Sequence, residues 1–167
     1  MIELKLKNRK GNFNVNSKAV MDILKLRPDF EYVQDISNTI NQDNIMAFDC
    51  QLSEDIFAME DIEELLEEMG ENLDESYFNV IFEDVRVYLK DATDEIEAEL
   101  QDIYLVDNIR CFFDVYNIDE GFTDFKFVFV VSFEDIKIAS LTNLAKIVAK
   151  RQLVGASKFY SKKIELF

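Results

Sequence analysis

The beginning of the chain shows a strand-like alternation followed by a helix-like pattern. Apolar and charged residues alternate over residues 2–7, which is the period-2 pattern of a half-buried strand. The polar stretch 8–14 predicts a turn. Ser17 is a candidate N-cap for a helix over 17–26, and Pro28 favours an end to that helix before it.

Two further strands and the most regular helical pattern follow. Short apolar segments predict strands at 30–36 and 45–52. Apolar residues then recur at three- and four-residue steps over 54–69, which is the pattern of an amphipathic helix. Ser53 suits the N-cap of this helix, and Gly70 suits the position just after its end.

The segment from about 77 to 138 is rich in Phe, Val and Ile, and it predicts an antiparallel meander. Its strands are expected at 77–90, 95–105, 109–118 and 122–138. A helix is the competing interpretation of 95–105, because Glu, Ala and Leu favour helices. The run KFVFVVSF at 126–133 predicts a central strand that is buried on both faces.

The last part of the chain predicts a helix at 140–153 and a closing strand at 157–167. Because helices do not alternate regularly with the strands, we expect an α+β fold rather than a doubly wound one. Its sheet is expected to be mainly antiparallel, with the meander at about 77–138 and three helices at 17–26, 54–69 and 140–153. We expect a single domain over 1–167, with room for two lobes at 1–75 and 76–167.

Composition adds a strong charge asymmetry to this picture. The 167 residues include 34 acidic and 18 basic side chains, which gives a net charge of −16. Residues 28–85 contain eighteen acidic residues and no Lys or Arg. Hydrophobic residues make up 49% of the chain, so an acidic disordered tail is not expected. A field of this sign disfavours nucleic acid and anionic membranes over most of the surface, and it favours a basic protein partner.

Residue types argue against several kinds of catalytic site. The chain has no His, which excludes Ser-His-Asp, Cys-His and histidine-metal sites. Its four glycines form neither a dinucleotide-binding motif nor a P-loop, and no calcium-binding loop occurs. We therefore expect no catalytic residue, no metal and no cofactor. A carboxylate-dependent enzyme without a recognisable motif is the weakest of the functional hypotheses.

The two cysteines and the apolar segments bear on the compartment. Cys50 and Cys111 are far apart in sequence and form no CxxC pair, so two buried thiols are expected rather than a disulfide. The first residues lack the apolar core of a signal peptide, and no apolar stretch is long enough to span a membrane. We therefore expect a cytoplasmic protein.

The acidic residues in the middle of the chain are the candidate partner-binding residues. Glutamates at four-residue spacing on the predicted helix at 54–69 repel one another, which costs about 0.2–0.5 kcal/mol per pair. If 95–105 is a strand, Glu95, Glu97 and Glu99 form a row that loosely resembles a phosphate backbone. The competing interpretation is a charged face that serves solubility alone. The candidates are Glu60, Asp61, Glu63, Glu64, Glu67, Glu68, Glu71, Asp74, Glu75, Glu83, Asp84, Glu95, Glu97 and Glu99.

Basic residues gather at the two ends of the sequence. They are Lys5, Lys7, Arg9 and Lys10 near the start, and Lys158, Lys162 and Lys163 near the end. If both terminal strands join one sheet, these residues form a positive pole that could make a small contact with nucleic acid. Neutralisation of the acidic middle within the molecule is the alternative.

Together these patterns favour a non-enzymatic acidic protein that inhibits a basic, nucleic-acid-binding protein such as a nuclease by charge complementarity. Anti-CRISPR, anti-restriction and nuclease-immunity proteins have a similar profile of small size, acidity and no catalytic site; the similarity is one of composition and not of motif. The alternative is a structural, assembly or chaperone-like oligomer, for example of a phage, in which an exposed strand edge makes the contacts. Direct binding to nucleic acid or to a membrane is not expected.

Overall fold

Two antiparallel sheets and three helices make up the described part of the chain. The computed structural model describes residues 1–40, 42–53, 73–118 and 125–165, and it describes side chains within these ranges except at 73–78 and 154–165. The elements, in order, are β1 (Glu3–Asn8), β2 (Gly11–Asn16), α1 (Ser17–Lys25), β3 (Phe30–Asp35), the 3-10 helix η1 (Ser37–Thr39), β4 (Ile45–Leu52), α3 (Leu73–Tyr104), β5 (Arg110–Ile118), β6 (Phe125–Ser132) and α4 (Ile138–Glu165). This is an α+β fold, as the sequence predicts.

The larger sheet has the strand order β3-β4-β6-β5, and every neighbouring pair is antiparallel. Its strands confirm the predictions at 30–36, 45–52 and 109–118. Within β6, Lys126 is the one residue that is not buried. The expectation of a central strand that is buried on both faces is therefore confirmed.

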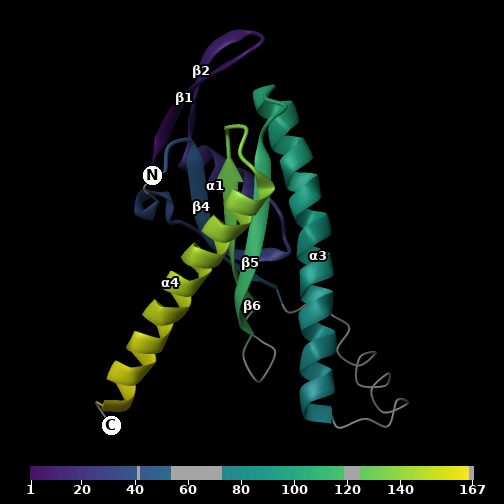
Figure 1. Ribbon diagram of the computed structural model, residues 1–167, viewed down its shortest axis with the longest axis vertical. Helices are drawn as coiled ribbons and strands as arrows, with labels where there is room; N and C mark the ends of the chain where they lie inside the picture. The colour runs from purple at the N-terminus through teal and green to yellow at the C-terminus, as the bar shows by residue number, and fades with distance from the viewer. Residues whose placement is uncertain (41, 54–72, 119–124, 166–167) are drawn as a thin grey trace.

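The two long helices lie on opposite faces of this sheet (Figure 1). Phe127 and Phe129 of β6 point to the face that carries α3, where they belong to the main hydrophobic core. Val130, one residue along, points to the other face and packs with Leu141 and Ala145 of α4. This alternation is what a strand between two helical layers requires.

The predicted strands at 77–90 and 95–105 are wrong, because both segments belong to the single helix α3. The competing helical interpretation of 95–105 is the correct one. Apolar residues of this helix recur at three- and four-residue steps, and one face is completely buried against the sheet. The buried residues are Ile81, Val85, Leu89, Ala92, Ile96 and Leu100. The alternation of apolar residues with glutamates over 95–100 covers too few positions to outweigh this longer helical period.

Two local predictions near the ends also need correction. The stretch 8–14 is not one turn: only residues 9 and 10 turn, and the polar residues after them form β2. The predicted strand at 157–167 is helical up to Glu165, because α4 continues past 153. The predicted helix at 54–69 lies outside the described residues.

The cap of α1 differs from the prediction by one residue. Asn16, not Ser17, is the N-cap, and its side chain accepts a hydrogen bond from the Ala19 N–H at 2.8 Å. Ser17 is completely buried instead, and its hydroxyl takes part in the polar cluster described below. The helix itself agrees with the predicted range 17–26.

Candidate partner-binding surface

The structure places five of the fourteen candidate acidic residues with their side chains. All five, Glu83, Asp84, Glu95, Glu97 and Glu99, belong to α3. Asp74 and Glu75 lie in the first turn of this helix, where side chains are not described. Glu60, Asp61, Glu63, Glu64, Glu67, Glu68 and Glu71 lie outside the described residues. The outer surface of α3 is therefore the part of the predicted acidic surface that can be described.

Four acidic residues form a straight line along α3. Asp84, Asp91, Glu95 and Asp102 follow one another at steps of seven, four and seven residues, so they lie within about 20° of one line at 100° per residue. All four are exposed, and Glu99 is exposed beside them. At a rise of 1.5 Å per residue, the line is about 27 Å long. We call these four residues the α3 acidic stripe.

Asp91 and Asp102 are functional candidates that the sequence analysis missed. Asp102 falls in the predicted strand at 95–105 and Asp91 in the connection before it, and a strand of period 2 does not place positions seven residues apart on the same face. A helical-wheel comparison of the acidic positions over 84–102 would have found both residues.

Most acidic residues of the stripe have no cationic partner among the side chains that the structure describes. Glu95 pairs with Arg27, whose Nη1 lies 3.1 Å from Oε2 of the carboxylate. Within the described residues, Asp84, Asp91 and Asp102 make no ion pair. Arg27 also binds Asp29 at 3.2 Å, and its guanidinium lies 5.5 Å from the centre of the Phe30 ring.

The expected row of Glu95, Glu97 and Glu99 does not exist, because successive odd-numbered positions of a helix point in different directions. Glu97 lies on the opposite flank of α3, toward the sheet. Its carboxylate accepts a hydrogen bond from the backbone N–H of Cys111 at 2.9 Å. Glu83 is on the same flank, 3.8 Å from Arg86.

This second flank of α3 forms a groove with β5 and the first turn of α4. We call this cavity of about 650 Å³ the β5 groove. Its apolar lining comes from Val87, Phe112, Phe113, Ile138 and Leu141, and its charged lining comes from Glu83, Arg86, Lys90, Asp94, Glu97 and Arg110. Val87 and Ile138 are 59% and 68% exposed, so apolar surface is open to solvent at this place.

The groove follows the free edge of the four-stranded sheet. In an antiparallel sheet, alternate residues direct both backbone groups to the same side. Because the Cys111 N–H bonds to a side chain of α3, Phe113 also directs its N–H and C=O away from β6. No strand pairs with this edge in the described part of the chain. Unpaired groups of this kind are where an additional strand can bind.

Asp114 of β5 is influenced by cations from both helical layers. Burial raises the pKa of Asp114 in β5 above its usual value, although Lys146 and Arg86 act in the opposite direction. Lys146 belongs to α4 and Arg86 to α3. The edge strand is therefore under the influence of cations from both sides.

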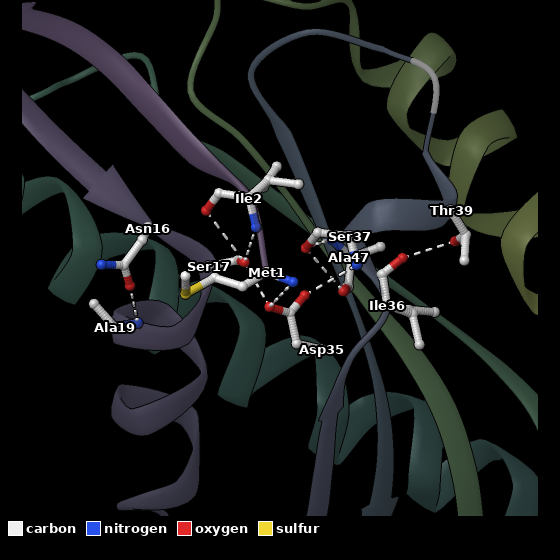
Figure 2. Close-up of polar contacts among 10 residues, drawn as sticks. All are labelled: Met1, Ile2, Asn16, Ser17, Ala19, Asp35, Ile36, Ser37, Thr39 and Ala47. Atoms are coloured by element: carbon white, nitrogen blue, oxygen red, sulfur yellow. Dashed lines mark hydrogen bonds and ion pairs between the residues drawn. The ribbon is translucent and has the colours of Figure 1, made fainter.

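A buried polar cluster joins α1, β3 and β4 (Figure 2). The Ser17 hydroxyl donates to Asp35 at 2.5 Å, and it accepts the Ile2 N–H at 2.8 Å. Asp35 also accepts the Ser37 N–H at 2.9 Å, and the Ser37 hydroxyl accepts the Ala47 N–H at 3.1 Å. Because these hydrogen bonds connect neighbouring elements with one another, the cluster stabilises the fold.

The hydrogen bonds of this cluster shift the titration of its carboxylate. Burial opposes the charged form of Asp35, but hydrogen bonds from Ser17 and Ser37 outweigh it and lower the pKa of Asp35 below its usual value. The side chain is 10% exposed. Asp35 is therefore charged in the folded protein at neutral pH.

The two cysteines are free and buried, as the sequence predicts. Both belong to the main hydrophobic core, on the side of the sheet that α3 covers. Burial, together with the neighbouring charges of Asp49 and Glu97, raises the pKa values of Cys50 and Cys111 well above the usual range. Neither thiol has the character of a nucleophile.

The expected positive pole from both ends of the chain is not formed as predicted. β1 pairs with β2 in a sheet of its own, and Lys158, Lys162 and Lys163 belong to α4 instead of a terminal strand. Lys5, Lys7, Arg9 and Lys10 are all exposed on the β1–β2 hairpin. We call these four residues the basic hairpin.

Over the described residues, no helix is both long enough and apolar enough to cross a membrane. The same residues contain no group of three acidic or Cys side chains arranged to hold a metal ion. No protein-family model, no curated protein and no solved structure matches this chain.

Proposed function

We propose that this protein is a non-enzymatic binding protein that docks on a basic protein through the α3 acidic stripe and so competes with nucleic acid for the basic surface. One observation carries the proposal: acidic residues are aligned and exposed along about 27 Å of one helix, and three of the four have no ion-pair partner among the described residues. The partner has a positively charged groove, of the kind found in nucleases and other nucleic-acid-binding enzymes.

The dimensions of the stripe support competition with nucleic acid. Duplex DNA advances about 3.4 Å per base pair, so a line of about 27 Å corresponds to roughly eight base pairs. Because the helix backbone is already folded, only the side chains of the stripe have to be ordered on binding. Complementary charge also accelerates the encounter of two proteins, and this acceleration weakens as salt rises.

A charge-reversal experiment tests the proposal. One variant carries Asp84→Lys, Asp91→Lys and Asp102→Lys. The matched control carries Asp22→Lys, Glu31→Lys and Asp135→Lys, which change the net charge equally at exposed positions outside the stripe. Each tagged protein is incubated with lysate, washed with increasing salt and analysed by mass spectrometry.

The expected result is a basic protein that the wild type and the control retain at low salt and release as salt rises. The stripe variant is expected to lose it. If all three proteins retain the same partners, the stripe is not the contact surface. If the control loses the partner as completely as the stripe variant, net charge and not the stripe governs binding.

The free edge of β5 favours a second candidate function, that of an assembly protein. Among the described residues the N–H and C=O of Phe113 have no strand partner, and Phe112 and Ile138 supply apolar surface beside them in the β5 groove. An oligomer built by strand addition would bury this edge. Phe113→Pro removes the N–H and leaves residues that face β6 unchanged. Size-exclusion chromatography with light scattering should then show an oligomer for the wild type and a monomer for the variant; a monomeric wild type excludes this function.

A further inference from the structure

The β1–β2 hairpin presents one face that is entirely polar, on which Lys5 and Lys7 lie beside asparagines. The register pairs Lys5 with Asn14 and Lys7 with Asn12, and all four side chains are exposed. Arg9 and Lys10 extend the same charge into the turn. Glu3, paired with Asn16, is the acidic residue of this ribbon, and it lies at the end far from the turn. We propose that the basic hairpin is a nucleic-acid contact that enters the major groove of duplex DNA.

The cations of the hairpin have no carboxylate partner in the part of the chain that the structure describes. Lys5, Lys7, Arg9 and Lys10 make no ion pair with any described residue. The alternative expectation, that these residues neutralise the acidic middle of the chain, therefore finds no support in the described part. In a chain of net charge −16, four neighbouring cations without carboxylate partners reverse the local field. Such a reversal attracts a polyanion to the hairpin.

The hairpin is held in a fixed position by its other face. Leu4 is buried, and the ring of Phe13 stacks on that of Tyr104, with 6.1 Å between ring centres. Asn8 donates a side-chain N–H to the backbone carbonyl of Tyr104 at 2.6 Å. The ribbon projects past the C-terminal end of α3 (Figure 1), and the side chains of its outer face are exposed. Because the backbone of the hairpin is already ordered, the entropy lost on binding is limited to that of the Lys and Arg side chains.

The turn is built to keep the two strands together. Asn8 accepts the Lys10 N–H with its side chain at 2.9 Å, and Gly11 has a φ of 117°. Asn at the first position and Gly at the fourth are the residues that a type I turn prefers. The positive φ of Gly11 is one that other residues rarely adopt. Arg9 and Lys10 are consequently fixed at the tip and directed outward.

Duplex DNA fits this ribbon better than other polyanions do. The major groove is about 12 Å wide and accepts a two-stranded ribbon, whereas the major groove of duplex RNA is too deep and narrow. Lysine binds phosphates and guanine, and asparagine can pair with adenine, so both residue types of this face have partners there. A membrane is disfavoured because the large apolar residues Leu6 and Phe13 are directed toward the protein.

A role in solubility alone does not explain the sign of these charges. Lysines on an exposed ribbon also prevent pairing with other strands. Acidic residues improve solubility more effectively than basic ones, and this chain uses them elsewhere. Contact with an anion explains why four cations gather on one ribbon of an otherwise acidic chain.

Fluorescence anisotropy with a labelled 20-base-pair DNA duplex tests the proposal on the full chain. The wild type is expected to bind, with a log–log slope of affinity against salt of about −3 to −4, because up to four phosphates are neutralised. The variant with Lys5→Ser, Lys7→Ser, Arg9→Ser and Lys10→Ser should lose at least tenfold in affinity. The control with Lys18→Ser, Lys25→Ser, Lys137→Ser and Lys150→Ser, all exposed positions, should stay within about twofold.

A second variant, Asn12→Ala with Asn14→Ala, keeps the charge and should keep the salt slope while it reduces discrimination between duplex sequences. Circular dichroism confirms that each variant is folded. Absence of binding by the wild type, equal binding by the Lys/Arg variant, or tighter binding to single-stranded DNA, duplex RNA or phosphatidylserine vesicles would each overturn the proposal. The assay contains no protein partner, so its outcome is separate from that of the acidic stripe.

Discussion

Glu97 of α3 accepts a hydrogen bond from the backbone N–H of Cys111, with 2.9 Å between Oε1 and N. The bond ties the helix to the free edge of β5 and satisfies a donor that would otherwise face the groove. Glu97→Ala leaves this N–H without its charged acceptor, and we expect a loss of about 1–2 kcal/mol in the free energy of unfolding. Urea denaturation of the wild type and the variant measures this difference in the free energy of unfolding.

Glu99→Ala is the matched control for this prediction, because Glu99 is exposed on the same helix and makes no hydrogen bond or ion pair among the described residues. Its effect should stay within about 0.5 kcal/mol. Equal effects of the two substitutions would show that the contact with β5 does not stabilise the fold.

Leu89 and Val87 distinguish the helix from the strand that the sequence suggested. A strand places these two positions on the same face, whereas α3 buries Leu89 and leaves Val87 59% exposed. Leu89→Ala should therefore cost about 2–5 kcal/mol of stability, and Val87→Ala about 0.5 kcal/mol or less. Chemical denaturation of both variants checks the difference, and similar losses would be inconsistent with the buried face of α3.

Asp35 makes stability depend on pH in acid. Its pKa is lower in the folded protein than in the unfolded chain, so it stabilises the fold above the unfolded value of about 3.9. This contribution is lost as pH falls through the folded pKa. Asp35→Asn should consequently lower Tm at pH 7 and have a progressively smaller effect toward pH 2. Thermal melts across this range test it, with the exposed Asp22→Asn as the control. A difference that stays constant with pH would contradict the role of the carboxylate charge.

The two thiols should be unreactive in the folded protein. Cys50 and Cys111 are 1% and 8% exposed, and burial raises their pKa values, so little thiolate forms at neutral pH. Ellman's reagent should detect neither thiol within minutes under native conditions and both after unfolding in guanidinium. Rapid reaction of the native protein would indicate that the core around β4 and β5 opens.

Strands that carry a continuous apolar run could be identified from the sequence alone. The segment Phe127 to Val131 has no polar residue, so both faces of this strand are apolar. A strand with two apolar faces has to be covered on both sides, which predicts a central position in the sheet. The α+β class, the strands around 30–36 and 45–52, and the free buried cysteines follow from similarly local properties. The absence of His also excluded several kinds of chemistry without reference to the fold.

The region 77–105 shows where local pattern is insufficient. Alternating residues such as Ile96, Ala98 and Leu100 suit a strand, while Ile81, Val85 and Leu89 suit a helix. Whether the segment forms a strand or a helix depends on which set of apolar residues the rest of the protein buries. The sheet packs against α3 and buries the set that recurs with the helical period. The same uncertainty hid two members of the stripe, Asp91 and Asp102, because alignment over 27 Å exists only when the helical period applies.

The sequence by itself determined four properties of this protein: its fold class, its central strand, the uneven distribution of its charges and the absence of histidine chemistry. Tertiary structure decided which charges meet. In the folded protein Glu97 lies against β5, whereas Asp84 and Asp102 are exposed along the α3 acidic stripe. The basic first residues form a separate two-stranded sheet. The physical reason is that hydrophobicity is a property of each residue, whereas a binding surface depends on the directions of side chains, which packing between distant segments sets.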